Sequence, residues 1–290
     1  MIPSEILKRI RAIEIKTRRV VNSTFSGEYH SVFKGQGMSF AEVKDYHPGD
    51  DIRLIDWNVT AKMQSPFIKV FEEERELTVM LMVDLSGSGD FGTSEKTKVE
   101  IAAEIAGVLG FSAINNQDKV GLLLFTDKVE RYIPPKKSKS HILRILRDIF
   151  YCNPESKLTS LKAGLEYMNN IMKKKCIVFL ISDFMDDGYE TSLKAVSRRH
   201  DVIPVVVEDP KEVELPKAGL ITLEDEETGD LIHVNSNSKH FRETFKNINT
   251  VRQNERDRLF KKLSLSAIHV KTNESYIEPL LMYFKTRSKK

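Results

Sequence analysis

Two patterns of apolar residues alternate through most of the chain. Continuous apolar stretches rich in β-branched side chains are typical of strands buried on both faces of a parallel sheet. Segments in which apolar residues recur every three or four positions are typical of helices packed on such a sheet. The predicted strands cover residues 77–84, 119–127, 176–182, 202–207 and 267–271, and the predicted helices cover residues 99–114, 142–149, 161–172, 191–199, 239–263 and 276–285.

Strands that alternate with helices in this way form right-handed βαβ units. The pattern therefore predicts an α/β fold with a doubly wound, mostly parallel sheet of the Rossmann type. Residues 129–133 are expected to turn back as an antiparallel edge strand, and residues 220–234 as a hairpin.

The first 75 residues have a different character. Residues 4–21 show helical spacing with basic side chains on the other faces, which predicts a surface helix. Residues 27–61 contain glycines and short alternating segments, which favour turns and small strands over helices, and residues 65–76 predict one further strand. We expect two domains: residues 1–75, an N-terminal helix plus a small β-rich companion domain, and residues 76–290, the large α/β domain with a C-terminal hairpin and helices.

Composition narrows the classes of protein to consider. No apolar run reaches the length that spans a bilayer, and the N-terminus lacks the apolar core of a signal peptide. Cys152 and Cys176 are too few for a disulfide framework, so we expect a cytoplasmic protein. The net charge of +3 is too small to indicate nucleic-acid binding, and the short lysine runs are interpreted as solvated helix ends.

The strand at 77–84 ends abruptly on oxygen-bearing side chains: Asp84, Ser86 and Ser88 are spaced two residues apart. The strand at 176–182 is likewise followed by an acid, Asp183. If the two strands are neighbours where the strand order reverses, all four side chains converge on one crevice. Oxygen ligands suit Mg²⁺, so a magnesium site is our leading hypothesis for this loop.

A hydroxyl from the segment 156–161 is a further candidate ligand, with Thr159 preferred over the adjacent Ser160. The alternative for the first loop is structural: Asp84 and Ser86 terminate a strand and cap the next helix. Asp186 and Asp187 are the nearest candidates for a catalytic base, but we expect them to cap the helix that follows.

The set Asp84, Ser86, Ser88, Thr159 and Asp183 resembles the metal-ion-dependent adhesion site of von Willebrand factor A domains. In that family the first Asp, the two Ser and the Thr surround a divalent cation, and the last Asp acts through water. The resemblance implies Mg²⁺, or Mn²⁺ or Ca²⁺ in its place, and a von Willebrand factor A-like fold. A cation held mainly by hydroxyls retains positive charge for an acidic side chain of a protein partner.

A second motif, residues 46–57, reads Tyr-His-Pro-Gly-Asp-Asp-Ile-Arg-Leu-Ile-Asp-Trp. Together with residues 33–38 and the Asp84 loop, it resembles the bacterial domain-of-unknown-function family fifty-eight. That family joins such a segment to a von Willebrand factor A-like domain, and its members are commonly encoded beside AAA+ ATPases of the MoxR type. Asp50, Asp51, Arg53 and Asp56 could form a catalytic acid cluster, but we favour a hydrogen-bond knot in which Arg53 pairs with a carboxylate and Trp57 packs beneath.

These observations predict a non-enzymatic, metal-dependent protein interaction module that acts with a MoxR-type ATPase in assembly or maturation of client proteins. Two alternatives stay open. One is a Mg²⁺-dependent hydrolase or phosphoryl-transfer enzyme that uses the Asp84 and Asp183 crevice, although no phosphate-binding glycine and lysine motif is present. The other is a structural scaffold with an empty loop.

Overall fold

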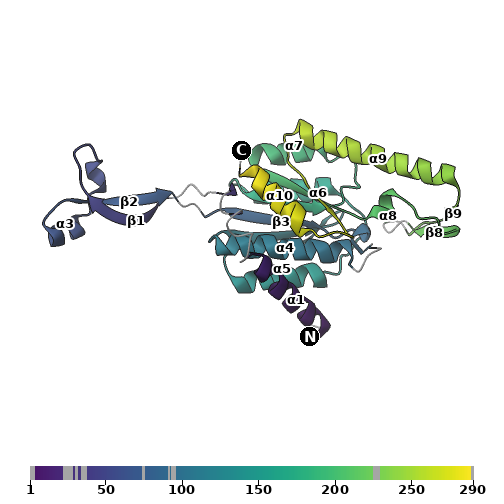
Figure 1. Cartoon of the computed structure of the whole chain (residues 1–290), viewed down its shortest axis with the longest axis horizontal. Helices are drawn as coiled ribbons and strands as arrows, with labels where there is room; N and C mark the ends of the chain where they lie inside the picture. Colours follow the sequence, from purple (N-terminus) through teal and green to yellow (C-terminus); the bar gives the residue numbers. More distant parts are fainter. Residues whose placement is uncertain are drawn as a thin grey trace. The chain divides into compact units, whose positions relative to one another are not determined.

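The computed structural model describes residues 4–21, 29, 32–33, 38–73, 76–90, 92, 96–224 and 229–288. It divides into two compact units (Figure 1). The larger contains Met1–Val32 and Thr78–Lys290, and the smaller contains Phe33–Leu77.

The larger unit is built on a six-stranded sheet in the order β10-β7-β6-β3-β4-β5. All neighbouring strands are parallel except β4 and β5, which are antiparallel. The predicted α/β fold with a mostly parallel sheet, including its antiparallel edge, is therefore confirmed. Its strands are β3 (Thr78–Asp84), β4 (Lys119–Phe125), β5 (Val129–Lys136), β6 (Ile177–Ser182), β7 (Asp201–Glu208) and β10 (Ile268–Lys271).

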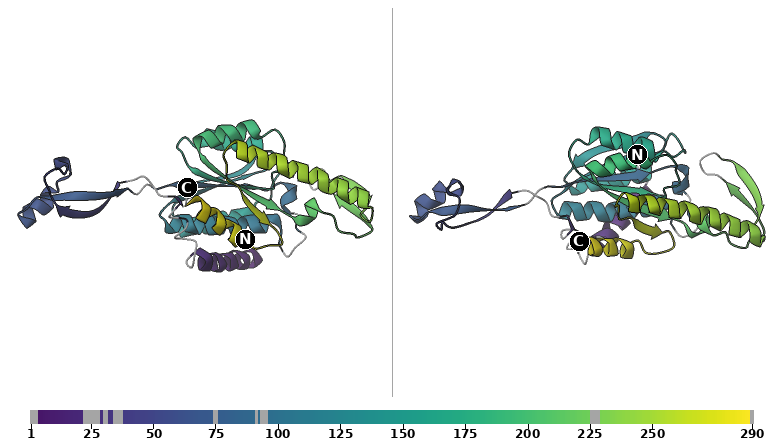
Figure 2. Two further views of the ribbon diagram at one scale, coloured as in Figure 1. Left: turned by 45° about the horizontal axis from the view of Figure 1, so that its top comes forward. Right: turned by 90° about the horizontal axis from the view of Figure 1, so that it is seen from above.

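Helices cover both faces of this sheet (Figures 1 and 2). On one side α4 lies against the strands, with α5 and α1 packed on it, and on the other side lie α6 and α7. A hairpin of β8 (Leu220–Glu224) and β9 (Leu231–Asn235) precedes the long helix α9. The helices are α1 (Ser4–Val20), α4 (Lys98–Asn115), α5 (Lys139–Tyr151), α6 (Leu161–Ile171), α7 (Glu190–Arg199), α8 (Pro210–Val213), α9 (Lys239–Lys262) and α10 (Ile277–Arg287).

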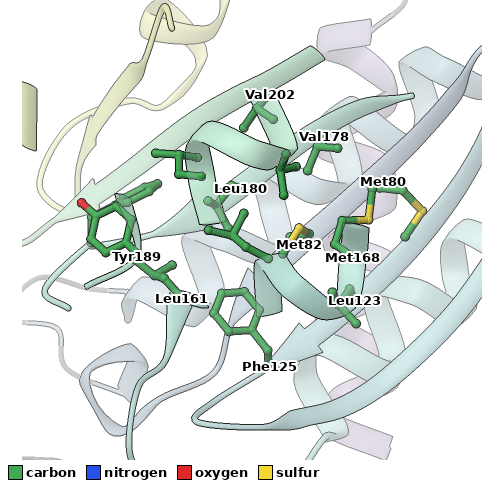
Figure 3. Close-up of a cluster of buried hydrophobic side chains, with 14 of the residues drawn as sticks. Met80, Met82, Leu123, Phe125, Leu161, Met168, Val178, Leu180, Tyr189 and Val202 are labelled. Carbon is green, nitrogen blue, oxygen red and sulfur yellow. The ribbon is translucent and has the colours of Figure 1, made fainter. Parts of the chain in front are cut away.

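The hydrophobic core explains why these segments fold as they do. β3 and β6 have almost every residue buried, as the continuous apolar runs predict, and α4 is buried along nearly its whole length. Alternate residues of β3, Met80 and Met82, face the α6 and α7 side and pack with Leu123 and Phe125 of β4 (Figure 3). No helix among the described residues is long and apolar enough to cross a membrane.

The N-terminal helix does not belong with the residues that follow it, contrary to our division at residue 75. α1 packs on α4 and α5 within the larger unit. Ile13 is buried, and Lys16 forms an ion pair with Glu104 of α4 at 2.8 Å. The apolar stripe that predicted a surface helix is therefore the face that joins this helix to the main core.

The smaller unit contains an antiparallel pair, β1 (Met38–Asp45) and β2 (Phe67–Glu73). Between them the structure has a 3-10 turn, η2 (Ile52–Leu54), and a short helix, α3 (Trp57–Met63), where we expected turns and strands only. Asp56 explains this helix, because its carboxylate accepts hydrogen bonds from the backbone N–H groups of Asn58 and Val59 at 3.0 and 3.3 Å.

The predicted pairing within the second motif is partly confirmed. The Arg53 guanidinium donates to both carboxylate oxygens of Asp51, at 2.8 Å from Nη2 and at 3.0 and 3.2 Å from Nε. Trp57, however, is 71% exposed and does not pack beneath the pair. Asp50 pairs separately with Lys44 at 3.2 Å. Residues 34–37 of the segment quoted with this motif lie outside the described residues.

Candidate metal site

The two acids that follow predicted strands lie next to each other because β3 and β6 are hydrogen-bonded neighbours. From β3 the chain continues to β4 on one side and later returns to β6 on the other. The strand order thus reverses between β3 and β6, which is the place where open α/β sheets bind ligands. Asp84 ends β3, and Asp183 directly follows β6.

Asp84 is a buried carboxylate with two fixed hydrogen bonds. Its Oδ1 accepts from the Ser86 N–H at 2.9 Å, and its Oδ2 accepts from the Ser182 hydroxyl at 2.7 Å. Burial and the nearby charge of Asp183 raise the Asp84 pKa to about 6, against the lowering effect of these hydrogen bonds. The ionised form of Asp84 is therefore destabilised in this structure, and a bound cation would stabilise it.

The loop after β3 holds both serines close to this carboxylate. The Ser86 and Ser88 hydroxyl oxygens are 3.2 Å apart. The backbone N–H of Gly87 donates to the Lys157 carbonyl at 2.8 Å, which fixes the loop to the segment before α6. Gly89 leaves room for α4, since a Cβ atom there would lie 2.8 Å from a methyl carbon of Val99.

Asp183 has a cationic partner that the sequence analysis missed, Lys98 at the start of α4. The Lys98 side chain is 5% exposed, and its ammonium lies 2.9 Å from Asp183 Oδ2 and also contacts Glu212 of α8. Burial opposes ionisation of Asp183, but Lys98 outweighs it and, with hydrogen bonds from Met185 and Ser88, lowers the Asp183 pKa. Asp183 thus ionises at lower pH than Asp84, because the pKa of Asp183 is lowered and that of Asp84 is raised.

A small cavity of about 20 Å³ lies among these groups. Its polar lining consists of Asp84, Ser86, Ser88, Lys98, Ser182 and Asp183. The space suits one water molecule or one ion. When both acids of the lining are ionised, Asp84 and Asp183 place two negative charges beside the single ammonium of Lys98, which Glu212 also contacts from outside the cavity. A divalent cation matches both the charge and the oxygen donors, so the residues fit the predicted ion.

The structure thus brings together Asp84, Ser86, Ser88 and Asp183. Thr159 does not line the cavity, although its segment touches the serine loop through Lys157. Ser160, the alternative, is the N-cap of α6, and its hydroxyl accepts from the Ala163 N–H at 3.2 Å. Within the described residues no cluster of three or more His, Cys, Asp or Glu side chains has the arrangement of a metal site. A cation held in this cavity would therefore need hydroxyl ligands in addition to carboxylates.

Asp186 has a different role from the one expected. Its carboxylate accepts from the backbone N–H of Leu161 at 2.7 Å, so it caps α6 and not the helix that follows it in sequence. α7 begins at Glu190 after Tyr189, which makes no side-chain capping bond. A carboxylate committed to a helix terminus is poorly placed to act as a general base.

The family model described as "Protein of unknown function DUF58" matches residues 42–255. The chain belongs to the DUF58 family. The matched range includes most of both units and all the residues around the cavity.

Relatives of this DUF58 protein include an uncharacterised protein of Mycobacterium tuberculosis (strain H37Rv), 29% identical over 223 residues, which are 76% of this chain and 70% of that protein. An uncharacterised protein of Mycobacterium avium is 23% identical over 128 residues, 44% of this chain and 75% of that protein.

Among solved structures, the conserved hypothetical protein BatB from Bacteroides thetaiotaomicron matches 74% of this chain and 100% of its own, with 14% identity and a TM-score of 0.47. An aerotolerance-related membrane protein from Bacteroides fragilis matches 73% of this chain and 98% of its own, with the same identity and score.

Proposed function

We propose that this protein is a metal-dependent protein interaction module of the von Willebrand factor A-like type, without enzymatic activity. Asp84, Ser86 and Ser88 would hold Mg²⁺, with Thr159 and Asp183 contributing from the neighbouring segments. The bound ion would supply a positively charged coordination position for an acidic side chain of the partner. The observation that carries this function is the convergence of Asp84, Ser86, Ser88 and Asp183 on one cavity at the strand-order reversal.

The chemistry of the lining favours binding over catalysis. Among the residues that the structure describes, the cavity lining includes no Cys or His, and the carboxylate of Asp186, the acid considered as a base, is bound to a helix terminus. A Mg²⁺-dependent hydrolase would need a base or nucleophile held beside the ion. For the partner we propose a MoxR-type AAA+ ATPase in the cytoplasm, on the family resemblance, with assembly or maturation of client proteins as the process.

Calorimetric titration with Mg²⁺ and Mn²⁺ tests the metal site. We expect binding by the native chain and its loss in Asp84→Ala, because this substitution removes the buried carboxylate at the centre of the cavity. Asp187→Asn is the matched control, since Asp187 is an exposed acid close in sequence to Asp183 that does not line the cavity. Absence of binding in the native chain, or unchanged binding in Asp84→Ala, would refute the metal site.

Lys98 favours a second candidate, a structural scaffold. Its ammonium already neutralises Asp183 from inside the protein, as an ion otherwise would. In that case a partner would bind equally well with and without a chelator. Pull-down with the purified ATPase in the two conditions separates the two functions, because a metal-dependent module loses its partner on chelation.

A further inference from the structure

A second and larger cavity, of about 330 Å³, lies between the segment that follows Asp183 and the C-terminal half of α9. One wall comes from residues 184–190 and the other from residues 252–259. Pockets for small ligands or single side chains begin at about this volume. The cavity neighbours the candidate metal site, because Phe184 is the next residue after Asp183.

The floor of this cavity is aromatic. The rings of Phe184 and Tyr189 are buried with centroids 6.1 Å apart, and Phe260 of α9 packs behind Phe184 at 5.1 Å. Leu259 adds an aliphatic surface. Phe184 is held in the left-handed region, at φ 58°, which is uncommon for a bulky residue and turns the chain along this wall.

The Tyr189 hydroxyl is available to hydrogen-bond with a ligand in this cavity. Tyr189 is only 4% exposed and lines the cavity, and its hydroxyl makes no hydrogen bond to any residue that the structure describes. Figure 3 shows this hydroxyl pointing away from the surrounding core side chains. The hydroxyl oxygen is not enclosed by protein atoms, so it is open to the cavity and available to hydrogen-bond with a polar ligand there.

The walls around this hydroxyl are acidic. Asp186, Asp187, Glu190 and Glu255 all line the cavity. Two arginines also line the cavity: the guanidinium of Arg256 is paired with Glu208 at 2.8 Å and Asp257 at 3.1 Å, and Arg252 is exposed, so four acids face two arginines. The cavity therefore combines excess negative charge, an aromatic floor and a free hydroxyl acceptor.

We propose that this cavity receives an arginine side chain of the partner protein. A guanidinium is planar and positively charged, so it can stack on the aromatic floor and donate two parallel hydrogen bonds to a carboxylate of the wall. Its remaining N–H groups can donate to the Tyr189 hydroxyl. This inference rests on the proposed function only in placing a protein partner at this edge of the sheet, and it requires no metal.

The probes are the peptide acetyl-Gly-Arg-Gly-amide and its citrulline counterpart, which has nearly the same shape without the charge. Each is titrated into the full chain in the presence of a chelator and followed by amide chemical shifts. We expect millimolar binding of the arginine peptide, at least about fivefold tighter than the citrulline peptide, the size of one partly buried charge contact. The double variant Asp187→Asn/Glu255→Gln should bind the arginine peptide about fivefold more weakly than the native chain does. Tyr189→Phe should bind it about twofold more weakly, because one hydrogen bond is lost.

The matched control is Glu243→Gln/Glu278→Gln, which removes two exposed acids that do not line the cavity. It should bind the arginine peptide as the native chain does, and circular dichroism checks the fold of every variant. Equal binding of the two peptides, or undiminished binding in the Asp187→Asn/Glu255→Gln and Tyr189→Phe variants, would overturn the assignment. Asp84→Ala separates the two proposals, because it should lose Mg²⁺ binding and keep arginine-peptide binding.

Discussion

At the scale of single residues, the fold changes the protonation of Asp84. Burial and Asp183 raise its pKa to about 6 in the folded protein, whereas an unfolded Asp titrates near about 3.9. Between these values the folded state binds more protons than the unfolded state, so this residue makes stability fall as pH rises. In chelator, we expect the native chain to lose roughly 2 kcal/mol of unfolding free energy relative to Asp84→Asn between pH 4 and pH 7.

Urea denaturation of both proteins across this pH range measures the difference. Asp187→Asn is the control, because it removes an exposed acid that does not line the cavity around Asp84. Saturating Mg²⁺ should reverse the trend in the native chain only, since the ion binds the ionised carboxylate. Parallel stability curves for the native chain and Asp84→Asn would contradict the raised pKa.

At the scale of elements, α9 packs against the segment that follows Asp183. Phe260 is 2% exposed and packs edge-on against Phe184, the residue after Asp183. We expect Phe260→Ala to destabilise the fold by about 3 kcal/mol through the cavity that it leaves. It should also weaken Mg²⁺ binding, because Phe184, the residue after Asp183, loses a packing contact. Urea denaturation and calorimetry measure the two effects.

Phe284→Ala is the matched control for α9. Phe284 is fully buried on α10 and packs against Tyr283, away from the Asp183 segment. This variant should be destabilised to a similar degree and keep its Mg²⁺ affinity. If both variants lost the same fraction of metal binding, the effect would come from general destabilisation and not from the position of Phe184.

The elements differ in how far the sequence could predict them. Strands such as β3 and β6 were predictable because their burial on both faces leaves a continuous apolar run. α3 could not be predicted in this way, because it has no buried residue and therefore no apolar stripe. The capping residue Asp56 is its one sequence feature typical of a helix. Lys98 was missed because its partners, Asp183 and Glu212, are 85 and 114 residues away in sequence. Such a pairing depends on how α4 and α8 come together at the carboxyl ends of the parallel strands.

At the scale of the whole molecule, sequence order and structural units do not coincide. α1 precedes the smaller unit in the chain, yet it packs on α4 and α5. Gly107 of α4 allows this close approach, because a Cβ atom added there would lie 3.3 Å from methyl carbons of both Ile13 and Thr17. Glu14 adds an ion pair with Lys139 at 3.1 Å. The smaller unit, Phe33–Leu77, is thus an insertion between two segments of the larger unit, and none of its described residues lines either cavity.

Replacing residues 33–77 with a Gly/Ser linker of about 15 residues should therefore leave the larger unit folded, because long flexible linkers cost little free energy. Mg²⁺ affinity should be that of the native chain. Deletion of residues 1–21 is the informative comparison, since it uncovers Gly107 and the buried faces of α4 and α5 and should destabilise the fold strongly. Thermal unfolding and calorimetry on both variants distinguish these expectations. A collapse of metal binding on replacement of 33–77, with α1 dispensable, would instead support a single N-terminal domain ending near residue 75.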